Sequence, residues 1–293
     1  MIRDFVYLRP RTIGEALDLL SQHKDDSKII CGGQSLLILM RQGLISPPYL
    51  IDIKRLNETR FILFDPEQGL KMGATTTHRD VEKSTVIRER YPVLAAMERK
   101  LASIQTRNWG TLGGNLCHGE PAGDLAPVLI ALKATLKLAR RGRERSIAVE
   151  EFFKDYFETA LDKDELLLEI HVPIPPSRSA ATYEKFTLVE NDIGIVSVAA
   201  SVTLEGANAR CKEARIVLGG AAPIPLRAGK GEEVLIGKEM NDRLLDQAAQ
   251  AASEEAQPIS DIHASEVYRR QLVKVLTKRM VRQAWEKARA LVQ

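Results

Sequence analysis

The sequence predicts an α+β protein with two domains. Its 293 residues exceed the roughly 100–200 residues of a usual single domain. Short apolar strands alternate with helical stretches in the first half, whereas the second half has alternating strands followed by long amphipathic helices. A proline-rich stretch at residues 172–180 lies between them. We therefore expect one domain at residues 1–176 and a smaller one, of antiparallel sheet plus helices, at residues 177–293.

The first elements follow from capping and turn residues. Thr12 and Glu15 form a capping-box pattern ahead of a short amphipathic helix. Gly32 and Gly33 interrupt an apolar run, which predicts a strand, a tight turn and a helix that ends at Gly43. The expected elements here are a strand at residues 28–31, a helix at 35–42, a strand at 49–53 and a hairpin at 61–74.

The middle of the chain contains a helix, a glycine-containing stretch and more strands. Pro92 fits the first turn of a helix that runs to about Ala102, and we expect an irregular loop from there to Leu125. Beyond the loop, the pattern predicts two strands around a charged turn at residues 135–149, a strand at 164–175, two strands at 197–206 and 213–220, and helices capped by Asn241 and Ser265.

Composition excludes several classes of function. The formal net charge is only +3, and no basic block carries interleaved aromatic residues, so nucleic acid is not an expected partner. The N-terminus lacks the apolar core of a signal peptide and no run approaches the roughly 18 apolar residues of a membrane helix, so we expect a cytoplasmic protein without a membrane span. Cys31, Cys117 and Cys211 are far apart without a CxxC pattern, which argues against a disulfide framework, a metal site or an iron–sulfur cluster in this chain.

Two glycine pairs in the first half suggest a phosphate site. Gly32 with Gly33 precedes Ser35, and Gly113 with Gly114 precedes Asn115. Backbone N–H groups that converge at a turn or helix start can hold a pyrophosphate, and a residue without Cβ lets the backbone approach it closely. Two such loops could hold one diphosphate from opposite sides, or each pair could simply make a tight turn. Neither loop matches GxGxxG or GxxxxGK[ST], so a Rossmann or P-loop site is not supported.

The two glycine segments lie in longer stretches that resemble a known family. "ICGGQSLLILMRQGLISPPYLIDI" and "QTRNWGTLGGNLCHGEPAGDLAPVLIAL" are similar to the two FAD-binding signatures of the flavoprotein (medium) subunit of molybdenum hydroxylases, the family of aerobic carbon monoxide dehydrogenase and xanthine dehydrogenase. Similarity continues through "YEKFTLVENDIGIVSVA", "LGGAAPIPLRA" and "SEVYRRQLVKVLTKR", so it covers nearly the whole chain. The resemblance implies a two-lobed FAD-binding domain of the vanillyl-alcohol-oxidase/PCMH type and a smaller C-terminal domain.

The resemblance also implies which residues bind FAD. In the first loop they are Ile30, Cys31, Gly32, Gly33, Gln34, Ser35, Leu36 and Leu37, and in the second they are Thr111, Leu112, Gly113, Gly114 and Asn115. The backbone amides of both loops, with Ser35, would bind the diphosphate. Further implied contacts are Leu101, Asp124 on the sugar chain, Leu167, Lys185, and Ile193 beside the flavin ring. Gln34 occupies the position of a flavin-linking histidine in distant relatives, so FAD is expected to be non-covalent.

Each of the outlying contacts has a simpler alternative. Leu101 and Leu167 could be core leucines, Lys185 a solvated surface lysine, and Asp124 the cap of a helix that begins near Leu125. The remaining candidates are expected to have no part in the chemistry. His78 and His118 lack a second ligand at metal spacing and are read as structural or exposed, and Cys31 as a small packing residue, with a role beside the flavin as its alternative.

One departure from the family pattern lies close to Lys185. Many relatives carry an arginine three or four residues after the lysine, where this chain has Leu188 and Val189. The difference bears on how the edge of the flavin is tuned and on which acceptor reoxidises it.

The implied function is electron transfer within a larger enzyme. A large molybdopterin subunit would oxidise the substrate, a small subunit with two [2Fe–2S] clusters would deliver the electrons, and this chain would pass them to an external acceptor, in a dimer of heterotrimers. No catalytic acid, base or nucleophile is then needed here, because the cofactor supplies the redox chemistry. Two alternatives stay open: a self-sufficient FAD reductase of the UDP-N-acetylenolpyruvoylglucosamine reductase type, and a non-catalytic flavin-binding protein.

Overall fold

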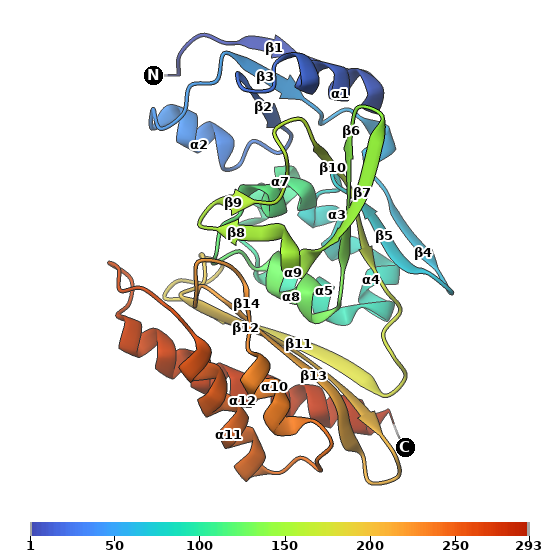
Figure 1. The fold of residues 1–293 in the computed structure, drawn as a ribbon, viewed down its shortest axis with the longest axis vertical. Coiled ribbons are helices and arrows are strands. Elements are labelled where there is room, and N and C mark those ends of the chain that lie inside the picture. Colours follow the sequence, from blue (N-terminus) through green and yellow to red (C-terminus); the bar gives the residue numbers. More distant parts are fainter. Residues whose placement is uncertain (1, 292–293) are drawn as a thin grey trace.

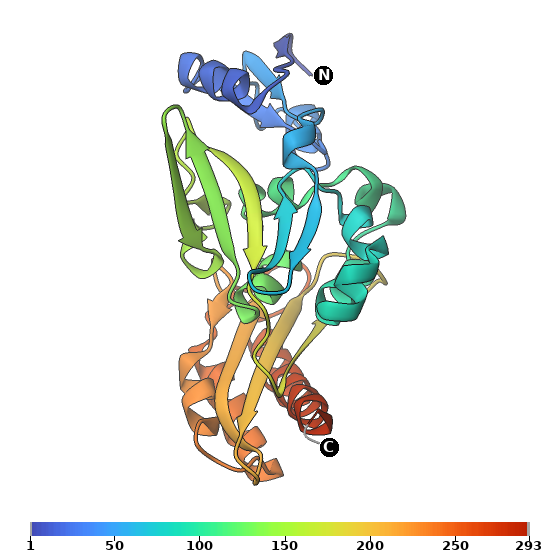
Figure 2. The same ribbon diagram turned by 90° about the vertical axis from the view of Figure 1, so that its right-hand side faces the viewer.

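The computed structural model describes residues 2–291, which form three parts stacked along the longest axis (Figure 1). A small N-terminal lobe lies at one end, a second lobe in the middle and the C-terminal domain at the other end, as the turned view also shows (Figure 2). The α+β class, with a two-lobed first domain and a smaller antiparallel sheet domain, is confirmed. Among residues 2–291, no helix is long and apolar enough to cross a membrane.

The N-terminal lobe is built on a parallel sheet in the order β1-β3-β2. Its elements are β1 (Val6–Leu8), α1 (Ile13–Gln22), β2 (Ser27–Ile30), α2 (Leu36–Arg41) and β3 (Tyr49–Asp52). The predicted cap is confirmed, because the Thr12 side chain accepts from the backbone N–H of Glu15. The Glu15 carboxylate accepts from the N–H of Arg11 at 2.7 Å, whereas a capping box would have it accept from the N–H of Thr12, one residue later.

The second lobe contains a five-stranded antiparallel sheet in the order β4-β5-β10-β6-β7. Both predicted hairpins are confirmed, as β4 with β5 and as β6 with β7. The strands of this lobe are β4 (Ile62–Asp65), β5 (Gly69–Gly73), β6 (Thr135–Arg140), β7 (Arg143–Ala148), the short pair β8 (Phe153–Asp155) and β9 (Glu158–Thr159), and β10 (Leu166–Val172). Its helices are η1 (Asn57–Thr59), α3 (His78–Lys83), α4 (Thr85–Arg90), α5 (Pro92–Lys100), α6 (Ile104–Trp109), α7 (Leu112–His118), α8 (Leu125–Ala131) and α9 (Val149–Phe152).

The expected irregular loop between Ala102 and Leu125 is wrong, because α6 and α7 lie within it. Ser103 caps α6 by accepting from the N–H of Thr106, and Thr111 caps α7 by accepting from the N–H of Gly114. Side-chain caps of this kind satisfy the free N–H groups of a first turn and make a short helix possible despite two glycines. Gly113 and Gly114 therefore lie in the first turn of a helix, not in a loop.

The C-terminal domain is a four-stranded antiparallel sheet in the order β11-β12-β13-β14, with helices on one face. Its elements are β11 (Ser179–Phe186), β12 (Val196–Glu205), β13 (Arg210–Gly219), β14 (Leu226–Arg227), α10 (Gly229–Leu235), α11 (Asp242–Glu255) and α12 (Glu266–Ala290). Asn241 and Ser265 cap α11 and α12 as predicted.

The C-terminal sheet is packed on both faces. Thr182 points to α12, since its hydroxyl donates to the Met280 carbonyl at 2.9 Å, and the next residue, Tyr183, points to the opposite face. That opposite face holds α8, every residue of which is buried. Ala199 and Val217 of the C-terminal sheet accordingly belong to the same apolar cluster as the core of the second lobe. Side chains of the two domains are therefore within direct reach of one another at α8.

Candidate cofactor site

The first glycine loop, residues 30–37, joins β2 to α2 and presents a row of unused backbone donors. Among residues 2–291, no protein acceptor lies within hydrogen-bonding geometry of the N–H groups of residues 32–36. Gly33 has a φ of +68°, in the left-handed region that residues with a Cβ rarely adopt. Ser35 stands at the N-cap of α2, yet its hydroxyl makes no cap hydrogen bond. The loop thus offers five amides and a hydroxyl to an anion, which is the donor set a diphosphate needs.

In the second glycine segment, residues 109–115, the N–H groups of residues 112–115 are already engaged. Leu112 N–H donates to the Thr76 carbonyl at 3.0 Å, Gly113 N–H to the Ala74 carbonyl at 2.8 Å, and Asn115 N–H to the Thr111 carbonyl at 3.0 Å. Gly114 N–H donates to Thr111 Oγ1 at 3.2 Å. Protein acceptors hold these four N–H groups, so phosphate binding by the amides of this segment stays a prediction, and the first loop is the better supplied with free donors.

The glycine pair of the second segment instead allows close packing. A Cβ on Gly113 would lie 2.8 Å from Ala74 Cβ and 2.9 Å from the Ala74 carbonyl oxygen. Gly114 is exposed, and among residues 2–291 outside the backbone of its own helix, an added Cβ would meet only Thr111 Oγ1, at 2.9 Å. The segment can therefore lie close to a ligand without donating backbone hydrogen bonds to it.

The two glycine segments touch each other. A Cβ on Gly32 would lie 2.4 Å from the Trp109 carbonyl oxygen and 2.9 Å from Gly110 Cα. Only a residue without Cβ permits this approach, so the prediction that both segments belong to one site agrees with their contact. Gly110, which is the partner of Gly32, was missed in the sequence, although it stands three residues before the second glycine pair.

A buried charged cluster lies at the start of α8. Asp124 is 6% exposed, and its carboxylate accepts from the Lys185 ammonium at 2.7 Å and from the Tyr183 hydroxyl. Lys185 also donates to the Asp192 carbonyl at 2.8 Å. Burial raises the pKa of Asp124 and the Lys185 charge opposes that shift, while burial and the Asp124 charge raise the pKa of Tyr183 well above its usual value. The cluster is assembled from both domains.

Two simpler readings of this cluster are excluded by its geometry. Asp124 stands at the N-cap of α8, but its side chain makes no cap hydrogen bond. The side chain of Lys185 is 4% exposed, so it is not a solvated surface lysine. Tyr183 was missed as a site residue, although it lies two positions before Lys185 on a strand and so shares its face.

A second buried pair supports the second glycine segment. His78 Nδ1 lies 3.0 Å and 3.1 Å from the two carboxylate oxygens of Glu98, which is fully buried on α5. Burial raises the pKa of Glu98, and the neighbouring His78 opposes the shift. His78 also donates its backbone N–H to the Gly110 carbonyl at 3.1 Å. The structural reading of His78 is therefore confirmed, and Glu98 is its unpredicted partner.

Comparison with known proteins decides the family. Residues 3–175 match the model of the FAD binding domain in molybdopterin dehydrogenase, and residues 181–284 match that of the CO dehydrogenase flavoprotein C-terminal domain. The chain belongs to this flavoprotein family. The free amides and glycines of the first loop fit the dinucleotide FAD, whose diphosphate needs such donors.

Relatives match this FAD-binding flavoprotein over almost its whole length. The glyceraldehyde dehydrogenase medium chain of Sulfolobus acidocaldarius is 34% identical, covering 94% of this chain and 96% of that one. The nicotine 6-hydroxylase medium subunit of Paenarthrobacter nicotinovorans is 35% identical, with 95% and 96% covered. Carbon monoxide dehydrogenase from Hydrogenophaga pseudoflava, a solved structure, superposes with a TM-score of 0.94 at 31% identity, covering 98% of this chain and 99% of that one.

The remaining predicted FAD contacts of this flavoprotein lie in different surroundings. Leu101 and Leu167 are 6% and 2% exposed and share the core cluster of the second lobe, as their simpler reading requires. Arg107 donates to the Leu101 carbonyl at 2.8 Å and so holds the turn after α5. Ile193 is 52% exposed in the loop after β11, together with Leu188 and Val189. The flavin contacts of these residues stay predictions.

The other loop residues are placed as follows. Ile30 ends β2, and Leu36 and Leu37 form the half-buried first turn of α2. Gln34 is exposed and donates to the Gly32 carbonyl at 3.0 Å. Burial raises the pKa of the Cys31 thiol to about 11, which keeps it protonated and fits a packing role.

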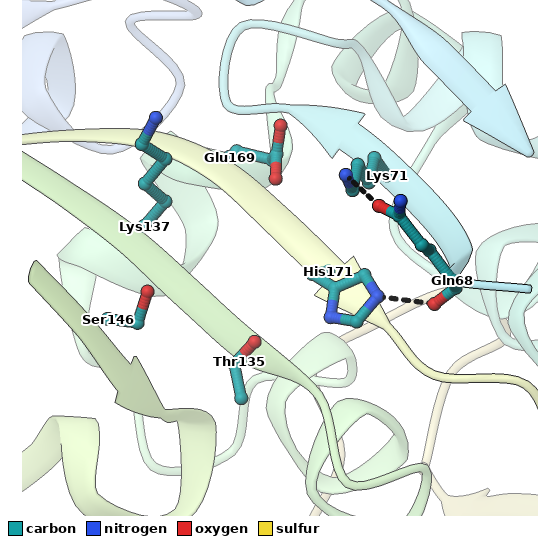
Figure 3. A pocket seen from close by; sticks show the side chains of 7 residues that line it. All are labelled: Gln68, Lys71, Thr135, Lys137, Ser146, Glu169 and His171. Carbon is teal, nitrogen blue, oxygen red and sulfur yellow. Dashed lines mark hydrogen bonds between the residues drawn. The ribbon is translucent and has the colours of Figure 1, made fainter. Parts of the chain in front are cut away.

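A polar depression of about 320 Å³ lies elsewhere, on the outer face of the second-lobe sheet (Figure 3). Lys71 Nζ donates to the Gln68 side chain at 2.6 Å, His171 Nε2 lies 2.6 Å from the Gln68 carbonyl, and Lys137 pairs with Glu144 at 2.8 Å. Lys71, His171 and Lys137 thus already have protein partners, unlike the amides of the first glycine loop.

Proposed function

We propose that this chain is the FAD-carrying electron-transfer subunit of a three-subunit molybdenum hydroxylase. The observation that carries the proposal is its match to medium chains of dehydrogenases and hydroxylases, with 94–96% of each chain covered. A small [2Fe–2S] subunit would supply electrons, a large molybdopterin subunit would oxidise the substrate, and the complex would be a dimer of heterotrimers in the cytoplasm. Bound FAD supplies the redox chemistry, and the chain sets its position and surroundings.

The residues that would hold FAD are those of the glycine segments and the buried cluster. The N–H groups of residues 32–36 and the Ser35 hydroxyl would bind the diphosphate, because protein acceptors leave them free. The second glycine segment would contribute the bare backbone of Gly114 and the side chains of Thr111 and Asn115. Asp124 and Lys185 would orient the sugar chain and the flavin end, and the covering residues would be Leu101, Leu167 and Ile193.

We also propose that the two domains divide at residues 176 and 177. The stretch at residues 173–178 contains neither helix nor strand, and it joins β10 to β11. The division supports the functional assignment, because Asp124 then comes from the FAD-binding domain while Lys185 and Tyr183 come from the C-terminal domain.

Among residues 2–291, no group of three or more His, Cys, Asp or Glu side chains is placed to hold a metal ion. The proposal accordingly assigns both the iron–sulfur clusters and the molybdenum centre to partner subunits. A self-sufficient reductase is disfavoured, because residues 181–284 match the CO dehydrogenase flavoprotein C-terminal domain.

The complex purified from its native source tests this proposal. We expect the chain to co-purify with two further subunits, one carrying iron and one carrying molybdenum, and with one FAD per chain. In stopped-flow, reduction of the clusters by substrate should precede bleaching of the flavin absorbance. A chain that purifies alone with FAD, and whose flavin is not reduced by the iron–sulfur subunit, would favour the non-catalytic flavin-binding alternative.

A further inference from the structure

A third glycine pair, Gly219 and Gly220, ends β13 where the two domains meet. A Cβ on Gly219 would lie 2.4 Å from Ser197 Oγ and 3.0 Å from Pro127 Cγ. Gly220, with a φ of +66°, donates its N–H to the Pro121 carbonyl at 2.8 Å. Pro121 and Pro127 stand three residues to either side of Asp124 in the sequence. The end of β13 thus rests directly on the segment that carries the buried aspartate.

The strand register explains why small residues are needed there. Lys185 lies opposite Ser197, and Ser197 lies opposite Gly219, so these three residues form one row on one face of the sheet. Side-chain size falls along the row from lysine to serine to glycine. Gly219, which has no side chain, leaves room for the start of α8. At the other end of the row, the Lys185 ammonium reaches the Asp124 carboxylate at 2.7 Å.

The far end of α8 is also held by the C-terminal sheet. The Ser201 hydroxyl donates to the Ala131 carbonyl at 2.9 Å, and Arg215 donates to the Ile130 carbonyl at 3.1 Å. With that end fixed, an added group at residue 219 must displace the beginning of α8. The displaced end is the one next to Asp124.

We infer that Gly219 and Gly220 are positioning residues for the cofactor site: they seat α8 on the C-terminal sheet, and this contact brings Lys185 and Tyr183 onto Asp124. The inference rests on the proposed function, in which Asp124 and Lys185 orient FAD. It adds that the affinity of the first domain for FAD depends on the absence of a side chain at Gly219 in the C-terminal domain.

Ser197 provides the means to test this requirement. Its Oγ is buried beside the Tyr183 hydroxyl and, among residues 2–291, forms no hydrogen bond of standard geometry, so Ser197→Ala removes the closest atom to residue 219, and Ser197→Ala alone serves as the control for any effect on Tyr183. Gly229 is a matched control, because its φ is not positive and no heavy atom would lie within 4 Å of an added Cβ. Gly219→Ala therefore crowds both Ser197 Oγ and Pro127 Cγ, the double variant with Ser197→Ala crowds Pro127 Cγ alone, and Gly229→Ala crowds neither.

The experiment measures FAD dissociation constants of the full chain by flavin fluorescence, and hydrogen exchange of the FAD-free chain. Gly219→Ala should weaken FAD binding about tenfold or more, because overpacking displaces buried partners. It should also speed exchange in residues 125–131 while leaving α1 unchanged. The added Ser197→Ala should restore part of both readouts, because the contact with Pro127 Cγ at 3.0 Å remains, and Gly229→Ala should change neither.

Two results would overturn the inference. The first is wild-type FAD affinity in Gly219→Ala, which would show that the contact does not position the site. The second is a double variant whose affinity and exchange are no closer to wild type than those of Gly219→Ala, which would show that crowding at this row is not the cause. A wild-type chain that binds no FAD at all would instead refute the proposed function, so the two failures are distinguishable.

Discussion

The two glycine segments of the first domain have similar sequences and opposite hydrogen-bonding states. Within the described residues 2–291, the amides of residues 32–36 have no protein acceptors, whereas the amides of residues 112–115 are all paired. The N–H groups of the first segment can therefore donate to a ligand, whereas those of the second hold α7 in place. Asp124 resembles the second segment in this respect, because its carboxylate is already paired with Lys185 and Tyr183. A glycine pair alone thus does not distinguish a phosphate loop from a packing contact.

The largest expected effect is on stability and comes from the paired region. Lys185→Met leaves the buried Asp124 without its cation and should reduce the free energy of unfolding by about 3–5 kcal/mol near neutral pH. Denaturant unfolding of the FAD-free chain measures this. The double variant with Asp124→Asn should recover part of the loss, and a single variant as stable as wild type would contradict the account.

The same variant has a predicted pH dependence. Burial raises the pKa of Asp124, and loss of the Lys185 ammonium raises that pKa further. A carboxyl whose folded pKa is raised costs no stability below its unfolded pKa, and the cost grows as pH rises through the folded pKa. The stability deficit of Lys185→Met should therefore be larger at about pH 8 than at about pH 5. A deficit that grows on acidification would have the wrong sign.

The next effect is on affinity and comes from the unpaired region. Gly32→Ala places a Cβ 2.4 Å from the Trp109 carbonyl oxygen, which must push the two segments apart. We expect FAD binding to weaken about 100-fold, measured by fluorescence titration. Gly14→Ala in the same lobe, where the nearest atom would be 3.8 Å away, is the control and should leave affinity unchanged.

Gly113→Ala should affect stability more than FAD affinity, the reverse of Gly32→Ala. Its Cβ would meet Ala74 at 2.8 Å, so the free energy of unfolding should fall by about 1–3 kcal/mol. The FAD affinity of the folded fraction should fall less than in Gly32→Ala. If Gly113→Ala lost more affinity than Gly32→Ala, the assignment of the two segments would have to be exchanged.

The smallest effect concerns the cap of α7. Thr111→Val removes the acceptor of the Gly114 N–H and should cost about 1 kcal/mol of stability. Thr111→Ser, which keeps the hydroxyl, should recover most of it in the same thermal unfolding experiment.

Local signals were enough to predict most elements and the first glycine loop. Thr12, Asn241 and Ser265 mark helix starts by their own capping hydrogen bonds, and the hairpins follow from their turn residues. The helices α6 and α7 were missed because two glycines weaken the local pattern, while α7 depends on acceptors at Ala74 and Thr76 far along the chain.

Asp124 and Lys185 were both candidates from the sequence, but their pairing with each other and with Tyr183 could not be predicted, for a related reason. Asp124 receives Tyr183 and Lys185 from a strand about sixty residues away, and Glu98 sits among apolar residues of α5 with His78 as its partner. Such long-range pairs follow from how α8 and α5 pack, which no local pattern contains. Free amides, in contrast, follow directly from the turn that exposes them.

Hydrogen exchange of the chain with and without FAD tests the central claim most directly. The account predicts that the amides of residues 32–36 gain strong protection when FAD binds, because the diphosphate becomes their acceptor. The amides of residues 112–115 should be protected already and change little. Tight FAD binding with no added protection at residues 32–36 would contradict the account.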